Sequence, residues 1–170
     1  KQDLEQCQPT THAPLIGSYR GFEVATNQLP GGGLMILEML NILECFDLAS
    51  MGHNSAAYIA TVAEAMKLAT IDKDTSMGDP NFVDVPVERL MSKSYAQTLA
   101  DRIKLGKKAH VRRINSGTPE SKDTTHLVVA DSDGNVVNLT HSLGSSSGVI
   151  TEGLGFMYNN CMMAVSYTHL

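Results

Sequence analysis

Apolar positions in the first part of the chain follow a strand pattern and then a helical pattern. Residues 19–26 alternate between two faces, with Phe22 and Val24 on one of them, and this alternation predicts a strand. The glycine-rich stretch at 29–33 predicts a turn or a loop of close backbone approach. From Leu34 to Phe46, apolar residues recur at three- and four-residue spacing, which predicts an amphipathic or fully buried helix.

Two further helices are expected before residue 103. The first follows Asn54 or Ser55, because either side chain can accept a hydrogen bond from a free N–H group at a helix start. It must end before residues 77–80, because Pro80 has no N–H and restricts Asp79. Its alanine-rich surface permits close packing. The second helix is expected at residues 92–102.

The pattern changes after residue 103. Residues 104–123 turn basic, then polar with glycine and proline, and they predict a linker. Two β-prone runs follow, at 125–130 and 135–143, joined by Asp131-Ser132-Asp133-Gly134, whose Asp-Gly pair favours positive φ at a tight hairpin. A small-residue loop is expected at 144–148 and an extended segment at 149–158. The linker therefore leads into a hairpin that begins at Thr124.

Composition narrows the function classes. The 170 residues are 42% hydrophobic and 18% charged with a net charge of −5, which is typical of a globular domain and makes nucleic acid an unfavourable partner. The local basic run from Lys104 to Arg113 is interpreted as a solvated segment. No apolar stretch approaches the ~18–20 residues of a membrane span. Cys7, Cys45 and Cys161 have no metal-ligand spacing and are interpreted as small apolar residues.

Thr124 is a candidate nucleophile because of its place directly after the linker. A threonine hydroxyl needs a base to take its proton, and the α-amine of an N-terminal threonine can be that base, with a reference pKa of ~8. Catalysis by an N-terminal threonine requires cleavage of an accessible segment before the threonine, and the predicted linker is such a segment. On these residues alone, an ordinary strand threonine is the commoner interpretation.

Longer motifs resemble the γ-glutamyltransferase family at its processing site. The core of the resemblance is Thr124-Thr125-His126 followed by Val128-Val129-Ala130-Asp131-Ser132-Asp133-Gly134-Asn135-Val136-Val137. Further motifs in the same order extend it over about residues 15–163: Tyr19-Arg20-Gly21-Phe22-Glu23-Val24, Gly32-Gly33, Leu40-Asn41-Ile42-Leu43-Glu44, Ala63-Glu64-Ala65-Met66-Lys67, Gly78-Asp79-Pro80-Asn81-Phe82 and Gly153-Leu154-Gly155-Phe156-Met157-Tyr158-Asn159-Asn160.

The resemblance implies an α+β fold of the N-terminal-nucleophile hydrolase type, a partial αββα sandwich. A precursor in that family cuts itself, here between Asp123 and Thr124, so residues 1–123 would end the large subunit and 124–170 would begin the small one. Thr124 would then take the γ-glutamyl group of a glutathione-like amide, or another acyl group, without a metal or organic cofactor. The subunits would be each other's partners, and the family is often periplasmic or extracellular.

The remaining candidate residues are expected to have either catalytic or structural roles. Ser142 matches the family's hydroxyl that hydrogen-bonds the nucleophile, whereas His126 is expected to be a structural strand residue because the terminal amine already provides the base. The glycines at 31–33 lack a following Gly-Lys-Ser/Thr and are interpreted as a structural turn, not a phosphate loop. The carboxylate pairs Asp72/Asp74 and Glu38/Glu44 are expected to be surface charges or helix contacts.

The chain departs from the family at the substrate-binding positions. Gly144 stands where transpeptidases carry an asparagine, and Ala164 stands near the place of an acidic residue. Residues 164–170 do not resemble the family and suggest a truncated or mis-joined end. The family's oxyanion glycines and carboxylate-binding arginine lie outside the chain. Two alternatives therefore stay open: an N-terminal-threonine amidohydrolase or acylase with another substrate, and a non-catalytic αββα relative.

Overall fold

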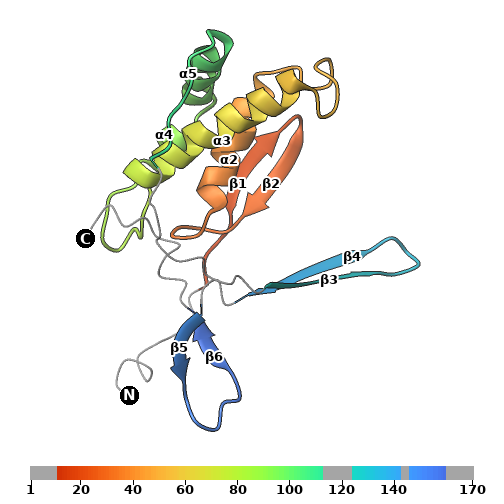
Figure 1. The fold of residues 1–170 in the computed structure, drawn as a ribbon, viewed down its shortest axis with the longest axis vertical. Coiled ribbons are helices and arrows are strands. Elements are labelled where there is room, and N and C mark those ends of the chain that lie inside the picture. Colours follow the sequence, from red (N-terminus) through yellow and green to blue (C-terminus); the bar gives the residue numbers. More distant parts are fainter. Residues whose placement is uncertain (1–10, 113–123, 143–145, 160–170) are drawn as a thin grey trace. The chain divides into compact units, whose positions relative to one another are not determined.

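The computed structural model describes residues 11–112, 124–142 and 146–159. The described residues fall into two compact units, one within 11–112 and the other within 124–159. Figure 1 shows the first unit as helices beside a two-stranded sheet and the second as two strand pairs.

The first unit opens with a hairpin of strands β1 (Leu15–Tyr19) and β2 (Phe22–Thr26), paired antiparallel. Arg20 and Gly21 form its two-residue turn with φ values of 51° and 84°, the positive values that the right-handed twist of a tight hairpin favours. The prediction of one strand over 19–26 was therefore partly wrong. Residues 22–26 form the strand, but Tyr19 ends a strand that the sequence pattern did not reveal.

Helix α2 (Gly33–Glu44) is the central element and contacts β1, α3, α4 and α5. The prediction of a helix from Leu34 is confirmed, and its buried side carries Leu34, Leu37 and Ile42. Glycine is needed at Gly31, just before the helix, and at Gly33, its first residue, because a Cβ on either would lie within 2.1 Å of Asn27 atoms. The glycine triplet is thus a turn of close backbone approach, as predicted.

Helix α3 (Ala56–Ser76) begins at the cap that the sequence indicated. The Ser55 hydroxyl accepts a hydrogen bond from the Tyr58 N–H at 3.1 Å, while Asn54 takes a positive φ before it. The helix ends before Gly78, as Pro80 requires. Ala65 and Ala69 are fully buried, so the small side chains let α3 approach its neighbours closely.

Two helices follow where one was predicted. The short α4 (Val87–Met91) was not foreseen, because five residues are too few to show a period, and α5 (Lys93–Lys104) confirms the helix expected at 92–102. Ser92 joins them: its hydroxyl donates to the Arg89 carbonyl at 2.8 Å and accepts from the Tyr95 N–H at 3.2 Å.

Two apolar clusters hold these helices together. The larger one is built from α2, α3 and α5, and the smaller one from α2 and α4 with Met77. Their fully or nearly fully buried members are Ile42, Ala65, Leu68, Ala96, Leu99, Ala100 and Ala109 in the first and Leu34, Met77 and Leu90 in the second. None of the helices within the described ranges is long and apolar enough to span a bilayer.

The second unit contains two antiparallel strand pairs, β3 (Thr124–Ala130) with β4 (Val136–Ser142) and β5 (Ser146–Ile150) with β6 (Met157–Asn159). The hairpin beginning at Thr124 is therefore confirmed. The loop predicted at 144–148 was wrong for Ser146 to Gly148, which lie in β5, and the extended segment predicted at 149–158 is interrupted by a turn before β6. Small residues alone misled the prediction, because they also fit a strand.

Candidate active site at the head of the β3–β4 hairpin

Strand β3 starts at Thr124, and β4 ends at Ser142, so both residues lie at the open end of the hairpin. The register pairs Thr124 directly with Ser142. Directly opposed residues of an antiparallel pair share one face of the sheet. The backbone thus brings together the two positions that the sequence analysis selected as nucleophile and hydroxyl partner. Asp123, on the other side of the predicted cleavage point, lies outside the described residues.

The next pair of positions on the same face is His126 and Thr140. The His126 Nδ1 atom lies 2.8 Å from the Thr140 hydroxyl oxygen, a hydrogen bond across the strands. The expected structural role of His126 therefore has a definite partner. The following pair on this face is Val128 and Asn138.

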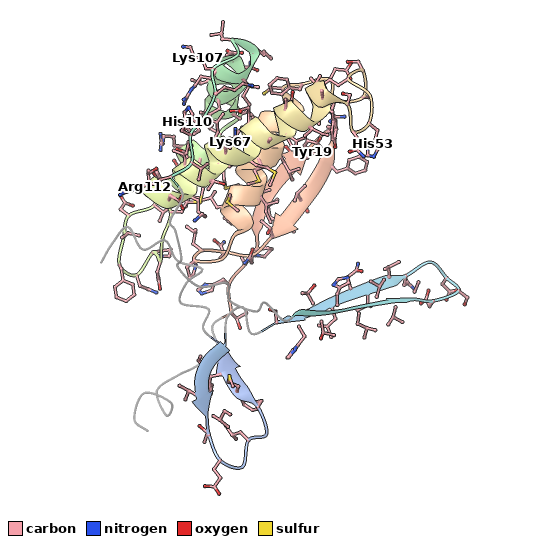
Figure 2. All side chains as sticks on the ribbon, viewed as in Figure 1. Tyr19, His53, Lys67, Lys107, His110 and Arg112 are labelled. Carbon is pink, nitrogen blue, oxygen red and sulfur yellow. The ribbon has the colours of Figure 1, made fainter. Side chains whose placement is uncertain are left out.

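The opposite face of the hairpin is apolar beyond the Thr125–His141 pair at its open end. Leu127 pairs with Leu139 and Val129 with Val137, and each of these four side chains is more than half exposed within the chain. Figure 2 shows side chains standing on both faces of this strand pair. The two faces therefore differ in the middle of the hairpin, where one carries the His126–Thr140 and Val128–Asn138 pairs and the other carries four aliphatic side chains.

The closed end of the hairpin is a tightly bonded loop. Asp131 Oδ1 accepts the N–H groups of Asp133 at 3.0 Å and Asn135 at 2.9 Å, and its Oδ2 accepts from Asn135 Nδ2 at 2.8 Å. These bonds, first of all that of the Asn135 side chain, lower the pKa of Asp131. Gly134 takes a φ of 84°, whereas Asp133 is not among the positive-φ residues. The expected positive φ of the Asp-Gly pair therefore falls on Gly134 alone.

The Leu40-Asn41-Ile42-Leu43-Glu44 motif is a structural junction in the first unit. Lys93 Nζ donates to the Ser18 carbonyl at 2.8 Å and to Asn41 Oδ1 at 2.6 Å, and it forms an ion pair with Glu44. The hydrogen bond from Lys93, followed by one from the Arg20 N–H, lowers the pKa of Glu44. The motif thus ties the β1–β2 hairpin and α5 to the end of α2, as expected for a helix contact.

The Ala63-Glu64-Ala65-Met66-Lys67 motif anchors the chain that leaves α5. The nearly buried Glu64 carboxylate accepts from the Ala109 N–H at 2.8 Å and pairs with Lys67 at 2.8 Å. Burial raises the pKa of Glu64, but these two hydrogen bonds, together with the charges of Lys67 and Lys108, outweigh that effect and leave the pKa lowered. Figure 2 labels Lys67 and, beyond Ala109, His110 and Arg112. Residues 113–123, the rest of the predicted linker, lie outside the described residues.

Glu38 takes the second of its two expected roles, that of a helix contact. It is fully buried rather than a surface charge, and it lies near Asp72, whose Oδ2 accepts a hydrogen bond from the Tyr95 hydroxyl at 2.7 Å. Burial, reinforced by Asp72, raises the pKa of Glu38 to about 9, and the Arg89 guanidinium opposes the shift. Burial also raises the pKa of Tyr95 to about 12, with Asp72 adding to it.

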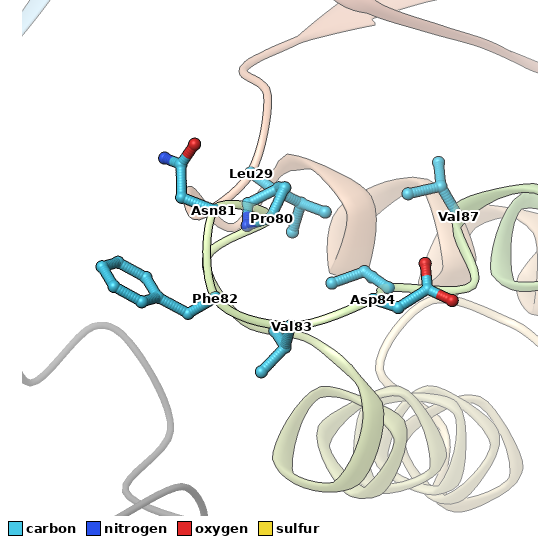
Figure 3. Close-up of a pocket in the computed structure, with 8 residues that line it drawn as sticks. Leu29, Pro80, Asn81, Phe82, Val83, Asp84 and Val87 are labelled. Atoms are coloured by element: carbon cyan, nitrogen blue, oxygen red, sulfur yellow. The ribbon is translucent and has the colours of Figure 1, made fainter.

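An open pocket of about 440 Å³ borders the Gly78-Asp79-Pro80-Asn81-Phe82 motif. Figure 3 shows Phe82 pointing away from the loop that carries it, and Asp84 is the one charged side chain of the eight drawn. The pocket brings no nucleophile and base together. Within the described ranges, no three His, Cys, Asp or Glu side chains are grouped to hold a metal ion. Cys45 is half-buried against the larger apolar cluster, as expected of a small apolar residue, and Cys7 and Cys161 lie outside the described residues.

The α+β chain, with a threonine at the start of a strand paired with a hydroxyl residue on the neighbouring strand, is of the N-terminal-nucleophile hydrolase class. The solved structures it resembles support this class. Cephalosporin acylase from Bacillus halodurans matches with a TM-score of 0.67 and 30% identity over 94% of this chain and 28% of that one. The γ-glutamyltranspeptidase of Helicobacter pylori matches with a TM-score of 0.52 and 38% identity over 54% of this chain and 26% of that one.

The sequence relatives identify the family. The sequence profile of the gamma-glutamyltranspeptidase family matches residues 1–169, and the chain belongs to this family. The glutathione hydrolase proenzyme of Escherichia coli is 39% identical over 168 residues, which are 95% of this chain and 29% of that protein. The acylase ACY 1 proenzyme of a Pseudomonas species is 38% identical over 164 residues, 94% of this chain and 29% of the relative. The chain therefore spans less than a third of either relative.

Proposed function

We propose that this chain belongs to a self-cleaving γ-glutamyltransferase or hydrolase that uses Thr124 as its nucleophile. The observation that carries the proposal is the register that sets Thr124 opposite Ser142 at the start of the hairpin, in a chain of the gamma-glutamyltranspeptidase family. Residues 1–123 would form the end of the large subunit and residues 124–170 the start of the small one. The two subunits would remain each other's partners.

Self-cleavage would proceed by an N-to-O acyl shift. The Thr124 Oγ attacks the Asp123 carbonyl carbon, the peptide C–N bond breaks, and the Asp123 acyl group passes to Oγ as an ester. The Thr124 amine takes up a proton as it is released. Water then hydrolyses the ester, which leaves a carboxylate on Asp123 and a free hydroxyl and α-amine on Thr124. The new amine is the base that the mature enzyme needs.

Turnover would use the same oxygen. The α-amine accepts the Thr124 hydroxyl proton while Oγ attacks the γ-carbonyl of a glutathione-like amide, and the substrate's amine leaves with that proton. The resulting γ-glutamyl ester is resolved by water, giving glutamate, or by an acceptor amine, giving a new amide. The Ser142 hydroxyl would orient the Thr124 oxygen through a hydrogen bond, from the position directly across the strands.

An acylase acting on another acyl group is the second candidate. Two observations favour it: the acylase relative is nearly as similar to this chain as the glutathione hydrolase, and Gly144 replaces the asparagine expected to hold the glutamyl head group. Because an unpaired polar head group loses affinity when its partners are missing, the substitution disfavours a zwitterionic substrate. Mass spectrometry of products from the full-length enzyme with γ-glutamyl, glutaryl and aliphatic amides separates the two candidates.

Self-cleavage is tested on the full-length parent protein by denaturing gel and N-terminal sequencing. We expect two bands, the smaller beginning at Thr124. Thr124→Ala should give a single band and no turnover, because a methyl group offers no nucleophile for either step, whereas Thr124→Ser should retain some processing. Two mature subunits from Thr124→Ala would contradict the assignment. A wild-type chain that stays whole would indicate the non-catalytic relative.

A further inference from the structure

The pairing of Thr124 with Ser142 depends on the register of one hairpin, and the two residues lie at the end far from its loop. Ala130 and Val136 form the last pair before the loop, six positions along each strand from the catalytic pair. A shift made at the loop is therefore transmitted along both strands to Thr124. The register must be held by something other than the catalytic residues themselves.

The apolar face excludes one kind of shift only. A slip of one residue would set Leu127 opposite Asn138 and move half of these aliphatic side chains to the other face, which is disfavoured wherever one face of a sheet is covered. A slip of two residues keeps every side chain on its face. It still pairs Leu127 with Val137 in one direction, or Val129 with Leu139 in the other. Aliphatic patterning alone therefore discriminates weakly against it.

A two-residue slip would change the catalytic pair. In one direction Thr140 would stand opposite Thr124, and in the other Gly144, which has no hydroxyl. The same slips would separate His126 from its Thr140 partner. The register seen here therefore has to be selected by polar contacts that exist in no other register.

We propose that Asp131 is a positioning residue for Thr124, because its carboxylate fixes the 131–135 loop in the one register that places Ser142 opposite the nucleophile. Its three hydrogen bonds to Asp133 and Asn135 close the loop together with the Asp131 N–H bond to the Asn135 carbonyl at 3.1 Å. In either slipped register the loop would close at other residues and these bonds would be lost. The inference rests on the proposed role of Thr124.

The alternation of antiparallel pairs supplies a covalent test. Counted from the backbone bond between Asp131 and Asn135, the Val128–Asn138 pair is of the non-hydrogen-bonded kind, in which Cα atoms lie about 4.5 Å apart and a disulfide can form. The Thr124–Ser142 pair is of the same kind. A disulfide at 128–138 would thus hold the native register without touching the catalytic pair or the loop.

The experiment measures the self-cleavage rate of the full-length precursor, and the kcat and KM of the mature enzyme, in matched variants. Asp131→Ala should slow cleavage and lower kcat by about tenfold or more, while KM changes less than about twofold. The reason is that the variant displaces the nucleophile but leaves the substrate contacts in place. Asp131→Asn, which keeps an oxygen for both backbone N–H groups, should recover most of both rates. Asp133→Ala is the control in the same loop and should behave as wild type.

Adding Val128→Cys and Asn138→Cys to Asp131→Ala should restore cleavage when the disulfide is oxidised, and reduction should abolish the rescue. Wild-type rates in Asp131→Ala would overturn the proposal, as would an Asp131→Ala defect that Asp131→Asn does not correct or that Asp133→Ala shares. An oxidised cross-link that leaves Asp131→Ala slow would show that Asp131 acts other than through register. A wild-type precursor that never cleaves would instead refute the proposed function of Thr124.

Discussion

Glu38 lies fully buried where four helices meet. It stands on α2, with Asp72 on α3, Arg89 on α4 and Tyr95 on α5 as its ionisable neighbours. Its two carboxyl oxygens have no hydrogen-bond partner of normal geometry in the described part of the chain. An ionised carboxylate without partners is costly to bury, so Glu38 is protonated at neutral pH. Burial of the Glu38 carboxyl group therefore costs free energy, which the surrounding apolar contacts offset.

The pKa of Glu38 makes the stability of the helices depend on pH. The folded state holds this proton up to a pKa of about 9, whereas the unfolded chain releases it near 4.5. The contribution of this bound proton to the free energy of unfolding is therefore fully present below about pH 4.5 and is lost as the pH rises toward 9. Glu38→Gln keeps the shape of the side chain but has no acidic proton to lose. We expect it to raise the free energy of unfolding at pH 8 by about 1–3 kcal/mol.

Urea unfolding of the 170-residue chain, followed by helical circular dichroism between pH 5 and 9, measures this difference. Glu88→Gln, an exposed acid in the short helix α4, serves as the control and should keep the wild-type pH dependence. Equal slopes of stability against pH in Glu38→Gln and wild type would show that Glu38 is ionised in the folded chain.

Ser142 provides the second prediction at this scale. In the full-length enzyme, Ser142→Ala should lower kcat by about tenfold to a hundredfold, since a hydrogen bond to the nucleophile is worth about 1–3 kcal/mol. Ser142→Thr keeps the hydroxyl and should retain most of the rate. The thermal midpoint should change little. Unchanged kinetics in folded Ser142→Ala would return Ser142 to the role of an ordinary strand residue.

Among the elements, helix α3 depends most visibly on one side chain. The Ser55 hydroxyl satisfies the Tyr58 N–H, one of the donors that a helix start leaves without a partner within the helix. Ser55→Ala should destabilise the helical unit by about 1 kcal/mol, and Ser55→Asp should not, because a carboxylate also accepts this bond and suits the positive end of the helix. Thermal unfolding by circular dichroism measures both. Equal midpoints for Ser55→Ala and wild type would show that packing alone fixes the helix start.

Local chemistry explains which elements were predictable. The helices α2, α3 and α5 are 12 residues long or longer, and each has a turn or a cap at its start. The sequence was therefore sufficient to predict them. Strand β1 has no alternation of large apolar residues; it pairs with β2, and Gly17 leaves room for Leu37 of α2 to lie against it, where a Cβ would come within 2.6 Å. Such a contact joins residues twenty positions apart, which no local pattern reveals.

At the scale of the whole molecule, the two units differ in burial, because the described residues of the second unit form no buried apolar cluster. Its strands expose Leu127, Val129, Val137 and Leu139, and also Val149 and Ile150, each by more than half. A two-stranded hairpin is marginally stable by itself, and exposed apolar faces of this kind bind other surfaces. The first unit, in contrast, buries two apolar clusters.

The 170-residue chain alone should therefore be inactive toward a γ-glutamyl anilide and should bind a hydrophobic dye strongly, while its helices still give a circular dichroism signal. The full-length precursor is the control and should bind the dye several-fold less, because the strands of β3–β6 are covered there. Clear hydrolysis of the anilide together with dye binding as weak as that of the full-length precursor would show that the chain completes its own site.

The sequence by itself determined the long helices, the β3–β4 hairpin and the candidate pair Thr124 and Ser142, because periodicity, capping residues and family motifs are local in the chain. Only the tertiary structure showed that these two positions are paired across the strands, since that depends on the register of a hairpin whose loop begins at Asp131, seven positions from Thr124. It also decided that Glu38 is buried and that Lys93 joins Asn41, Glu44 and Ser18. Burial and partner choice arise from contacts between distant segments, and a one-dimensional pattern does not contain those contacts.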